Sequence, residues 1–298
     1  MSRLAVIGDV VQDIVVWQRE EVRPATDTES EIFVQRGGSA ANVAAFAGPR
    51  VTTRFIGSVG DDLAGLVVTR ELEGHGVEAL MQVNGPATGT IVLQIDLSGE
   101  RNMFPFRGAS GLLHEIDREW LDDVDLLHVT AYSFETDSPR QAIIEAARRV
   151  HEAGGRVSLD VSSVYTVSRL GRERFIEVLC EIAPDVITAN EDETDVLGLA
   201  HDDAPGPLLA TLPGVTLLAR NGARATRVFR EGELLLTVPV EPAEEIRDLT
   251  GCGDAFNAGY LASLLNHGDD PERNVLDAHT LARRVLACPG ATEGPVDA

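Results

Sequence analysis

The sequence contains no lysine, so all of its 25 basic residues are arginines. A phosphate-binding loop of the Walker A type needs a lysine, as does Schiff-base chemistry, so both are excluded. Cysteine is also scarce: Cys180, Cys252 and Cys288 lie far apart, in neither a Cys-x-x-Cys pair nor a metal-binding spacing. This pattern predicts a reduced protein of the cytoplasm.

Positive charge is outnumbered, because 48 acidic residues against 25 arginines give a net charge of −23. Such a surface repels nucleic acid and anionic membranes, so we expect neither as a partner. No apolar run reaches membrane-spanning length, and we expect no secretory signal peptide. Aromatic residues make up only 5% of the chain against 44% apolar residues, so the core must be mainly aliphatic.

Apolar, β-rich runs alternate with segments of helical periodicity along most of the 298 residues. This predicts one α/β domain over 1–298, with a mostly parallel central sheet covered by helices on both faces. The expected strands are Leu4–Ile7, Thr53–Ile56, Leu126–Val129, Arg156–Leu159, Val186–Ala189 and Val215–Ala219. The expected helices are Ala40–Ala47, Asp61–His75, Pro139–Ala153, Arg172–Glu181, Glu191–Leu199, Gly253–Leu265 and Val275–Ala287.

Two segments, at about 12–35 and 88–108, break the alternation and have the residue pattern of hairpins. Both lie close in sequence to candidate site residues, so we predict a lid over a pocket; a pair of decorated edge strands is the alternative. In the helix predicted at Asp61–His75, the apolar residues at helical spacing are Leu63, Leu66, Val67 and Leu72.

The segment Asp248–Phe256 is a glycine-rich loop that leads into a helix. Consecutive N–H groups at a helix start favour an anion, and Gly251 and Gly253 let the backbone approach a phosphate closely. Asp254 stands near the start of this helix, where it can either cap the helix or act as a catalytic acid–base group.

Two further polar groups stand early in the chain. Gly37 and Gly38 precede a helix of small residues, in which Asn42 is a lone amide. If it is buried, this amide needs partners, and sugar hydroxyls suit it; a tight turn with close packing is the alternative. Asp13 follows the first predicted strand, at the sheet edge where α/β proteins bind ligands, although it could also be a solvated loop acid.

Asn190 and Glu193 follow the strand predicted at Val186–Ala189. Their spacing is that of a capping box at the start of a helix. Oxygen ligands at a strand end also suit Mg²⁺ that is held partly through water, so both interpretations stay open.

Taken together, the order and spacing of these motifs resemble the ribokinase-like PfkB family of carbohydrate kinases over nearly the whole chain. The segments that resemble the family motifs are Gly37–Asn42, Asn190–Glu193 and Asp248–Phe256. The resemblance implies a three-layer α/β/α domain with a small β lid. It also implies ATP-dependent phosphoryl transfer to a small sugar or sugar derivative, of the ribose, fructose or 2-keto-3-deoxygluconate class, with Mg²⁺ as cofactor.

The resemblance also implies residue roles. Asp254 would be the general base, with the backbone N–H groups of Gly251, Cys252 and Gly253 as an anion hole. The remaining roles fall to two groups of residues. Sugar binding would fall to Asp13, Gly37, Gly38, Asn42 and Arg107, and nucleotide and Mg²⁺ binding to Asn190, Glu193, Arg220 and Gly222.

Several positions depart from the family pattern, notably Leu249 in place of Thr and Cys252 in place of Ala. Family members often bind K⁺ through backbone carbonyls and an acid near the anion hole, and Asp248 is a candidate contributor, although Leu249 weakens that assignment. Arg220 is placed where its side chain could reach a phosphate of the nucleotide. Arg107 is either a sugar-site residue or a surface arginine.

Three other functions are weighed against a sugar kinase. A nucleoside kinase of the same family would stack the base on aromatic residues, of which the predicted lid has few. A non-catalytic binding protein on this fold is disfavoured by the intact Asp254 and its glycines. A dinucleotide-dependent dehydrogenase would need Gly-x-Gly-x-x-Gly after the first strand, where the chain has Gly8-Asp9-Val10-Val11-Gln12-Asp13. Apolar lid strands need cover, which makes a homodimer through the lid an expected partner arrangement.

Overall fold

The structure, a computed structural model, describes residues 2–85 and 87–293 of the chain. Its centre is a nine-stranded sheet in the order β15-β14-β13-β10-β9-β8-β1-β4-β5. The strands from β13 to β5 run parallel, while β14 and β15 add antiparallel to one edge. The bounds are β1 Arg3–Ile7, β4 Thr52–Val59, β5 Val77–Val83, β8 Leu126–Thr130, β9 Arg156–Asp160, β10 Val186–Asn190, β13 Thr216–Arg220, β14 Ala225–Arg230 and β15 Glu233–Pro239.

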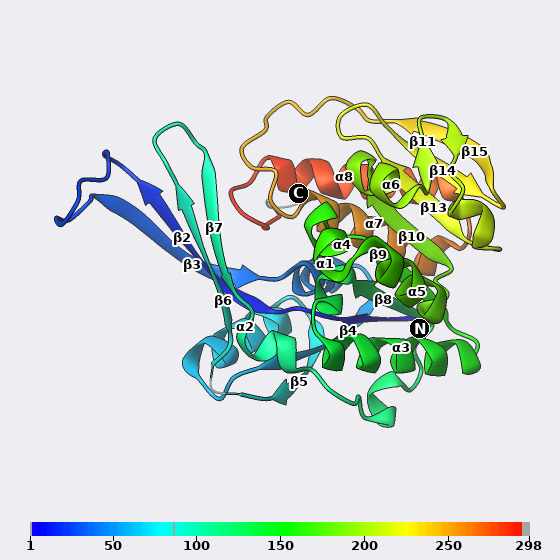
Figure 1. The fold of residues 1–298 in the computed structure, drawn as a ribbon, viewed down its shortest axis with the longest axis horizontal. Helices are drawn as coiled ribbons and strands as arrows, with labels where there is room; N and C mark the ends of the chain where they lie inside the picture. Colours follow the sequence, from blue (N-terminus) through cyan, green and yellow to red (C-terminus); the bar gives the residue numbers. More distant parts are fainter. Residues whose placement is uncertain (1, 86, 294–298) are drawn as a thin grey trace.

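Side chains of the central strands alternate between two hydrophobic cores, one on each face of the sheet. In β1, Leu4 and Val6 enter one core while Ala5 and Ile7 enter the other, as the two-residue period of a strand requires. Helices α1, α2, α7 and α8 cover the first face, and α3 to α6 cover the second (Figure 1). Their bounds are α1 Ser39–Ala47, α2 Leu63–Gly74, α3 Asp137–Glu152, α4 Val164–Leu170, α5 Arg172–Ile182, α6 Glu191–Leu197, α7 Cys252–His267 and α8 Pro271–Leu286.

The three-layer α/β/α architecture predicted from the alternation is therefore confirmed. Each of the expected strands and helices appears, with ends that shift by a few residues. Local signals fix several helix starts: the Asp62 carboxylate accepts the N–H of Gly65 in α2, and Asp270 accepts that of Arg273 in α8, where Pro271 occupies the first turn.

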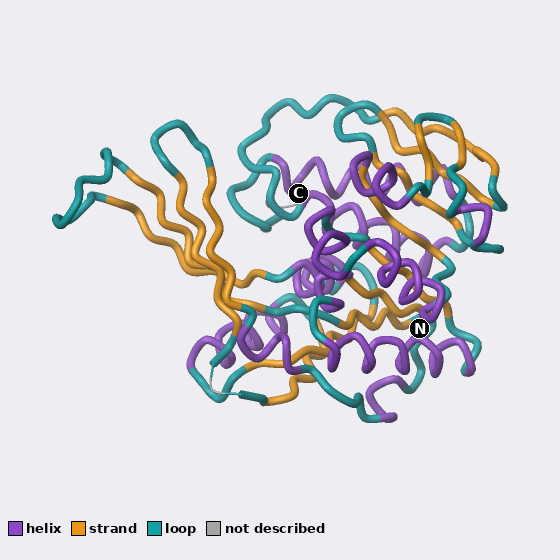
Figure 2. The backbone as a smooth tube through the Cα atoms, in the orientation of Figure 1, coloured by secondary structure: helices purple, strands orange, loops and turns teal. Residues whose placement is uncertain are grey.

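The two segments outside the alternation form a separate four-stranded sheet in the order β3-β2-β6-β7. Figure 2 shows this small sheet projecting from one side of the three-layer body. Strands β2 and β6 pair in parallel, and β3 and β7 flank them antiparallel. The bounds are β2 Val11–Gln18, β3 Ser30–Gly37, β6 Gly89–Ile95 and β7 Arg101–Phe106.

The helix predicted at Asp61–His75 is confirmed as α2, but only Leu72 of its four apolar residues at helical spacing is buried. Leu63, Leu66 and Val67 are exposed, and Val68 joins Leu72 in the core. The spacing predicts the helix, whereas tertiary packing decides which side faces the core. The sequence also gave no clear signal for β5, β14 and β15, which lie at the edges of the sheet and carry mixed polar residues.

Among the described residues, no helix combines the length and apolarity needed to cross a membrane.

Candidate active site

The start of α7 places Asp254 in a partly buried position beside α1. Gly251 is the N-cap and has a φ of 78°, and a Cβ there would lie 2.6 Å from the Cβ of Ala291, so only glycine fits. Asp254 lies in the first turn but does not cap the helix, because its carboxylate points to another helix. The interpretation of Asp254 as a helix cap is therefore wrong.

The carboxylate of Asp254 is bound by two side chains of α1. Ser39 Oγ donates to Oδ1 at 2.6 Å, and Asn42 Nδ2 donates to Oδ2 at 2.8 Å. Burial raises the pKa of Asp254 to about 7; the Ser39 and Asn42 hydrogen bonds oppose this shift, and the nearby Asp160 and Asp9 carboxylates add to it. A buried carboxyl with a pKa near neutrality can exchange a proton at physiological pH.

The start of α1 is held in place by Asp9, which the sequence analysis passed over. Asp9 ends the turn after β1, and its carboxylate accepts the backbone N–H groups of Ser39 at 3.1 Å and Ala40 at 3.2 Å. The hydroxyl of Thr130, at the end of β8, donates to it as well. The position of Asp9 directly after a buried strand is the feature that could have identified it from the sequence. Asp9 fixes the start of the helix that carries Ser39 and Asn42.

Asp13 lies on β2 beside this helix and is buried. Its Oδ1 atom has no hydrogen-bond partner, and burial raises its pKa to about 7 although the Arg36 guanidinium lowers it. A Cβ at Gly37 would collide with this carboxylate, so Gly37 provides the space that Asp13 occupies. An unpartnered buried acceptor of this kind suits a ligand hydroxyl.

Arg36, which directly precedes the glycine pair, was missed from the sequence. Its side chain is buried, and Nη1 donates to Oδ1 of Asn42, so the Asn42 amide is fixed with its Nδ2 toward Asp254. The Glu71 carboxylate lies 3.6 Å from Nε of Arg36. A chain of contacts therefore links Glu71, Arg36, Asn42 and Asp254. A single arginine in a strand has no sequence pattern that would predict these contacts.

Arg220, at the end of β13, lies next to the first turn of α7. Its guanidinium is paired with the buried Asp160 carboxylate at 2.9 Å and lies over the ring of Phe256 at 5.7 Å. A Cβ at Gly253 would lie 2.6 Å from Nη1 of Arg220, so this guanidinium is next to the start of α7. Positive charge is therefore fixed where the helix amides would meet an anion.

Asn190 and Glu193 form the capping box that their spacing predicted. The Asn190 side chain accepts the N–H of Glu193, and the Glu193 carboxylate accepts both the backbone N–H and the side-chain N–H of Asn190. Glu193 is buried, and its pKa is raised to about 7, first by burial and then by the Asp160 carboxylate.

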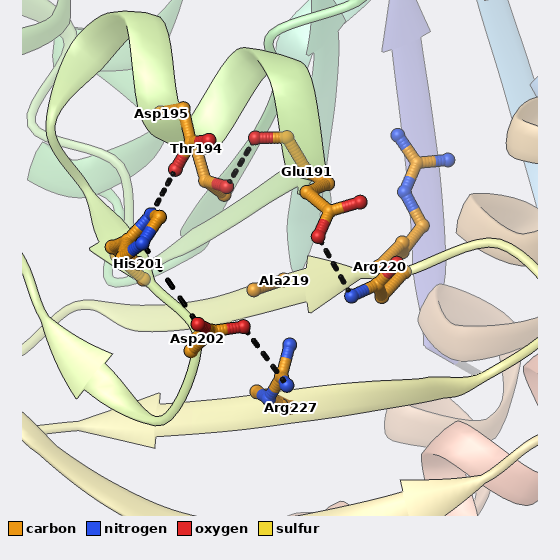
Figure 3. Close-up of a pocket in the computed structure, with 10 residues that line it drawn as sticks. Glu191, Thr194, Asp195, His201, Asp202, Ala219, Arg220 and Arg227 are labelled. Carbon is orange, nitrogen blue, oxygen red and sulfur yellow. Dashed lines mark hydrogen bonds and ion pairs between the residues drawn. The ribbon is translucent and has the colours of Figure 1, made fainter.

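A small hollow with polar lining lies beside Arg220, between α6, the segment from Ala200 to Asp202, and strands β13 and β14 (Figure 3). His201 pairs there with Asp195 at 3.0 Å, and Figure 3 shows Arg220 away from that pair. Gly222 lies in the turn that follows β13, with a φ of 52°.

A second hollow lies between Asp9 and the segment from Tyr132 to Thr136. Arg107 lines it, placed over the Tyr132 ring at 5.1 Å and paired with Glu135 at 3.3 Å. The structure therefore brings Arg107 to the Asp9 side of the site and holds its guanidinium in a defined position.

Asp248 has three donors around its carboxylate: the backbone N–H groups of Thr250 and Gly290, and the Arg101 guanidinium. Burial alone would raise the pKa of Asp248, but these backbone N–H groups and Arg101 hold it below its ordinary value. In the same loop the Cys252 N–H donates to the Leu249 carbonyl at 3.3 Å. In the described ranges, no group of three or more His, Cys, Asp or Glu side chains is arranged to hold a metal.

Comparison with known proteins agrees with this geometry. The family described as "pfkB family carbohydrate kinase" matches residues 1–298. An ATP-dependent ribose-1-phosphate kinase of Halopiger xanaduensis is 31% identical over 99% of this chain and 95% of its own length. A fructokinase of Vibrio alginolyticus is 31% identical over 90% of this chain and 86% of its own.

A solved structure of an adenosine kinase from Sinorhizobium meliloti has a TM-score of 0.83 and 22% identity, covering 97% of this chain and 95% of that one. This likeness shows the fold. The family match over the full chain and the two relatives above 30% identity show the family. The chain belongs to the pfkB family of carbohydrate kinases, and it is an ATP-dependent carbohydrate kinase.

Proposed function

We propose that this carbohydrate kinase transfers the γ-phosphoryl group of ATP to a hydroxyl of a small sugar, with Asp254 as the general base. The observation that carries the proposal is the Asp254 carboxylate, which is partly buried between α1 and α7 and is held by Ser39 and Asn42, with its pKa raised to about 7. A carboxylate placed in this way can take the proton of an acceptor hydroxyl as the new O–P bond forms.

The residues around Asp254 fit a nucleotide with Mg²⁺. ATP brings the transferable phosphoryl group, and Mg²⁺ neutralises its charge. The N–H groups of Gly251 and Gly253 and the fixed guanidinium of Arg220 would face the phosphate oxygens; Cys252, whose N–H also reaches Leu249, is the weaker donor.

The described residues include no group of three or more His, Cys, Asp or Glu side chains that could hold a metal ion. Mg²⁺ would therefore be held mainly by the phosphates, with Asn190 and Glu193 organising water around it. Gly222 would border the nucleotide in the turn after β13.

Sugar hydroxyls would bind between β2 and α1. Asp13 offers its unpartnered oxygen, Asn42 its oriented amide, and Gly37 and Gly38 leave room beside them. Arg107 would contact the acceptor from the Asp9 side of the pocket.

Acids outnumber arginines on the acceptor side of the site: among the described residues, Asp9, Asp13, Asp254 and Glu135 lie there with Arg36 and Arg107, while the charge of Arg220 is paired with Asp160. This balance favours a neutral sugar, such as the ribose or fructose class, over an anionic one.

An acceptor panel tests this proposal. Purified protein with ATP and Mg²⁺ would be offered ribose, fructose, 2-keto-3-deoxygluconate, ribose 1-phosphate and adenosine, with ADP formation as the readout. We expect a neutral sugar to be preferred by kcat/KM. Preference for ribose 1-phosphate would contradict the charge argument, and preference for adenosine would indicate a nucleoside kinase.

The small sheet is proposed to be a lid over the acceptor site and also the interface of a homodimer. Its strands expose large apolar side chains that a monomer in water would leave uncovered. They are Trp17, Ile32, Phe33, Val34, Met103, Phe104 and Phe106. Pairing of two such sheets would cover these residues and close each lid over its own site.

The three cysteines, Cys180, Cys252 and Cys288, are free thiols, which supports a reducing compartment. We propose that the enzyme acts in the cytoplasm, and the free thiols and the family assignment support this location.

Replacing Asp254 with Asn tests the base directly. Asn retains the size of Asp but cannot accept the proton, so kcat should fall by several orders of magnitude while the KM for the sugar changes little. Steady-state kinetics with the preferred sugar would measure both. Asp269→Asn, which removes an exposed acid that is paired with Arg230 far from the site, is the matched control. Near-normal turnover of Asp254→Asn would show that another group is the base.

The pKa of Asp254 sets a pH dependence. The base acts only when it is deprotonated, so kcat/KM should rise with pH through about 7 and be lost progressively below that value. Asp13 and Glu193 each have a pKa raised to about 7, so their protonation would add to the loss of kcat/KM at acidic pH. Initial rates between pH 5 and 9 would measure it. A rate that stays flat down to pH 5 would contradict a base with a raised pKa.

The proposed dimer predicts a concentration-dependent change in mass. Sedimentation velocity at micromolar concentration should give a dimer for the wild-type protein and a monomer for Phe104→Glu, because a buried charge would disrupt the apolar interface. Leu276→Glu, at another exposed apolar position, on α8, is the control and should remain dimeric. A wild-type monomer would count against the interface.

A further inference from the structure

The small sheet reaches the anion-hole loop through a single arginine. Arg101 begins β7, and its guanidinium donates through Nη1 to Thr250 Oγ at 2.8 Å and through Nη2 to Asp248 Oδ1 at 2.8 Å. Figure 1 shows the hairpin of β6 and β7 rising beside the loop that leads into α7. Asp248 is 147 positions and Thr250 is 149 positions after Arg101 in the sequence. The contact therefore joins the small sheet to the loop that precedes Gly251.

Both oxygens of the Asp248 carboxylate accept hydrogen bonds in this arrangement. Besides Arg101, its Oδ1 accepts the Thr250 N–H at 2.8 Å and its Oδ2 accepts the Gly290 N–H at 2.9 Å. Its side chain is only 17% exposed, so the negative charge is largely removed from water and needs a positive partner. The guanidinium is that partner.

The same carboxylate is the residue that the family resemblance assigned to K⁺. A monovalent cation bound to the Asp248 side chain would have to share the carboxylate with the guanidinium, and two cations in contact with one partly buried carboxylate repel each other. The residues present therefore do not fit K⁺ at Asp248 while Arg101 is in place.

We propose that Arg101 supplies the positive charge at Asp248, so that the anion-hole loop is held in position without K⁺. The proposal rests on the proposed function, in which this loop presents Gly251 and Gly253 to the phosphoryl group. Arg101 is a positioning residue in this scheme: it touches Asp248 and Thr250, not the reacting atoms. Because Arg101 belongs to the small sheet, the same contact joins the proposed lid to the anion-hole loop.

The test compares three proteins: the wild type, Arg101→Ala and Arg247→Ala. Arg247 is the matched control, since it directly precedes Asp248 but is exposed and pairs with Glu245 at 2.7 Å instead. Turnover with MgATP and the preferred sugar would be measured in KCl and in tetramethylammonium chloride at equal ionic strength, and again with guanidinium chloride at a low, non-denaturing concentration.

Wild type and Arg247→Ala should turn over equally in both salts. Arg101→Ala should lose about tenfold to a hundredfold in tetramethylammonium, as expected for a lost charged hydrogen bond pair, and should recover most of it in KCl or with guanidinium. A wild type that requires K⁺, an Arg101→Ala variant with unchanged turnover, or one that neither ion restores would each overturn the proposal.

The melting temperature gives a readout that needs no acceptor. Exchanging tetramethylammonium for K⁺ should leave the Tm of the wild type unchanged and raise that of Arg101→Ala, since only the variant has a carboxylate free to bind the ion. A K⁺-specific rise in the wild type would overturn the proposal. If no sugar is phosphorylated but Arg101→Ala shows this rise, the proposed function fails while the assignment of Arg101 stands.

Discussion

The arrangement of the site depends on one partly buried carboxylate. Asp254 is bound by Ser39 and Asn42, which are more than two hundred residues earlier in the chain. A charge in such a position is costly without partners, so α1 and α7 must lie close together. The small residues of α1 allow this approach, and Asp9 at the end of β1 fixes where that helix begins.

The charge of the whole molecule is opposed locally at this site. The chain carries a net charge of −23 and no lysine, yet its substrate ATP is an anion. Arg36, Arg101 and Arg220 are each held by a neighbouring acid, so their planar guanidinium groups keep fixed positions near the reacting centre. Fixed cations of this kind oppose the repulsive field without the flexibility of a lysine side chain.

Much of this could be predicted from the sequence, because the signals were local. The strand–helix alternation gave the three layers, and the glycine-rich turn before α7 gave the segment that carries Asp254. Arg36 and Arg101 could not be found in this way, because their meaning depends on partners brought together by the small sheet. The K⁺ assignment at Asp248 came from the resemblance, and the Arg101 contact, which no motif encodes, now argues against it.

The raised pKa of Asp254 is the property on which the catalytic account depends most directly. It can be measured by following the side-chain carboxyl ¹³C resonances of aspartate-labelled protein against pH, with Asp254→Asn used to assign the signal. The account predicts that the Asp254 carboxyl titrates near pH 7 in the protein without substrate. Titration near pH 4, as for an exposed aspartate, would contradict a buried base at this position.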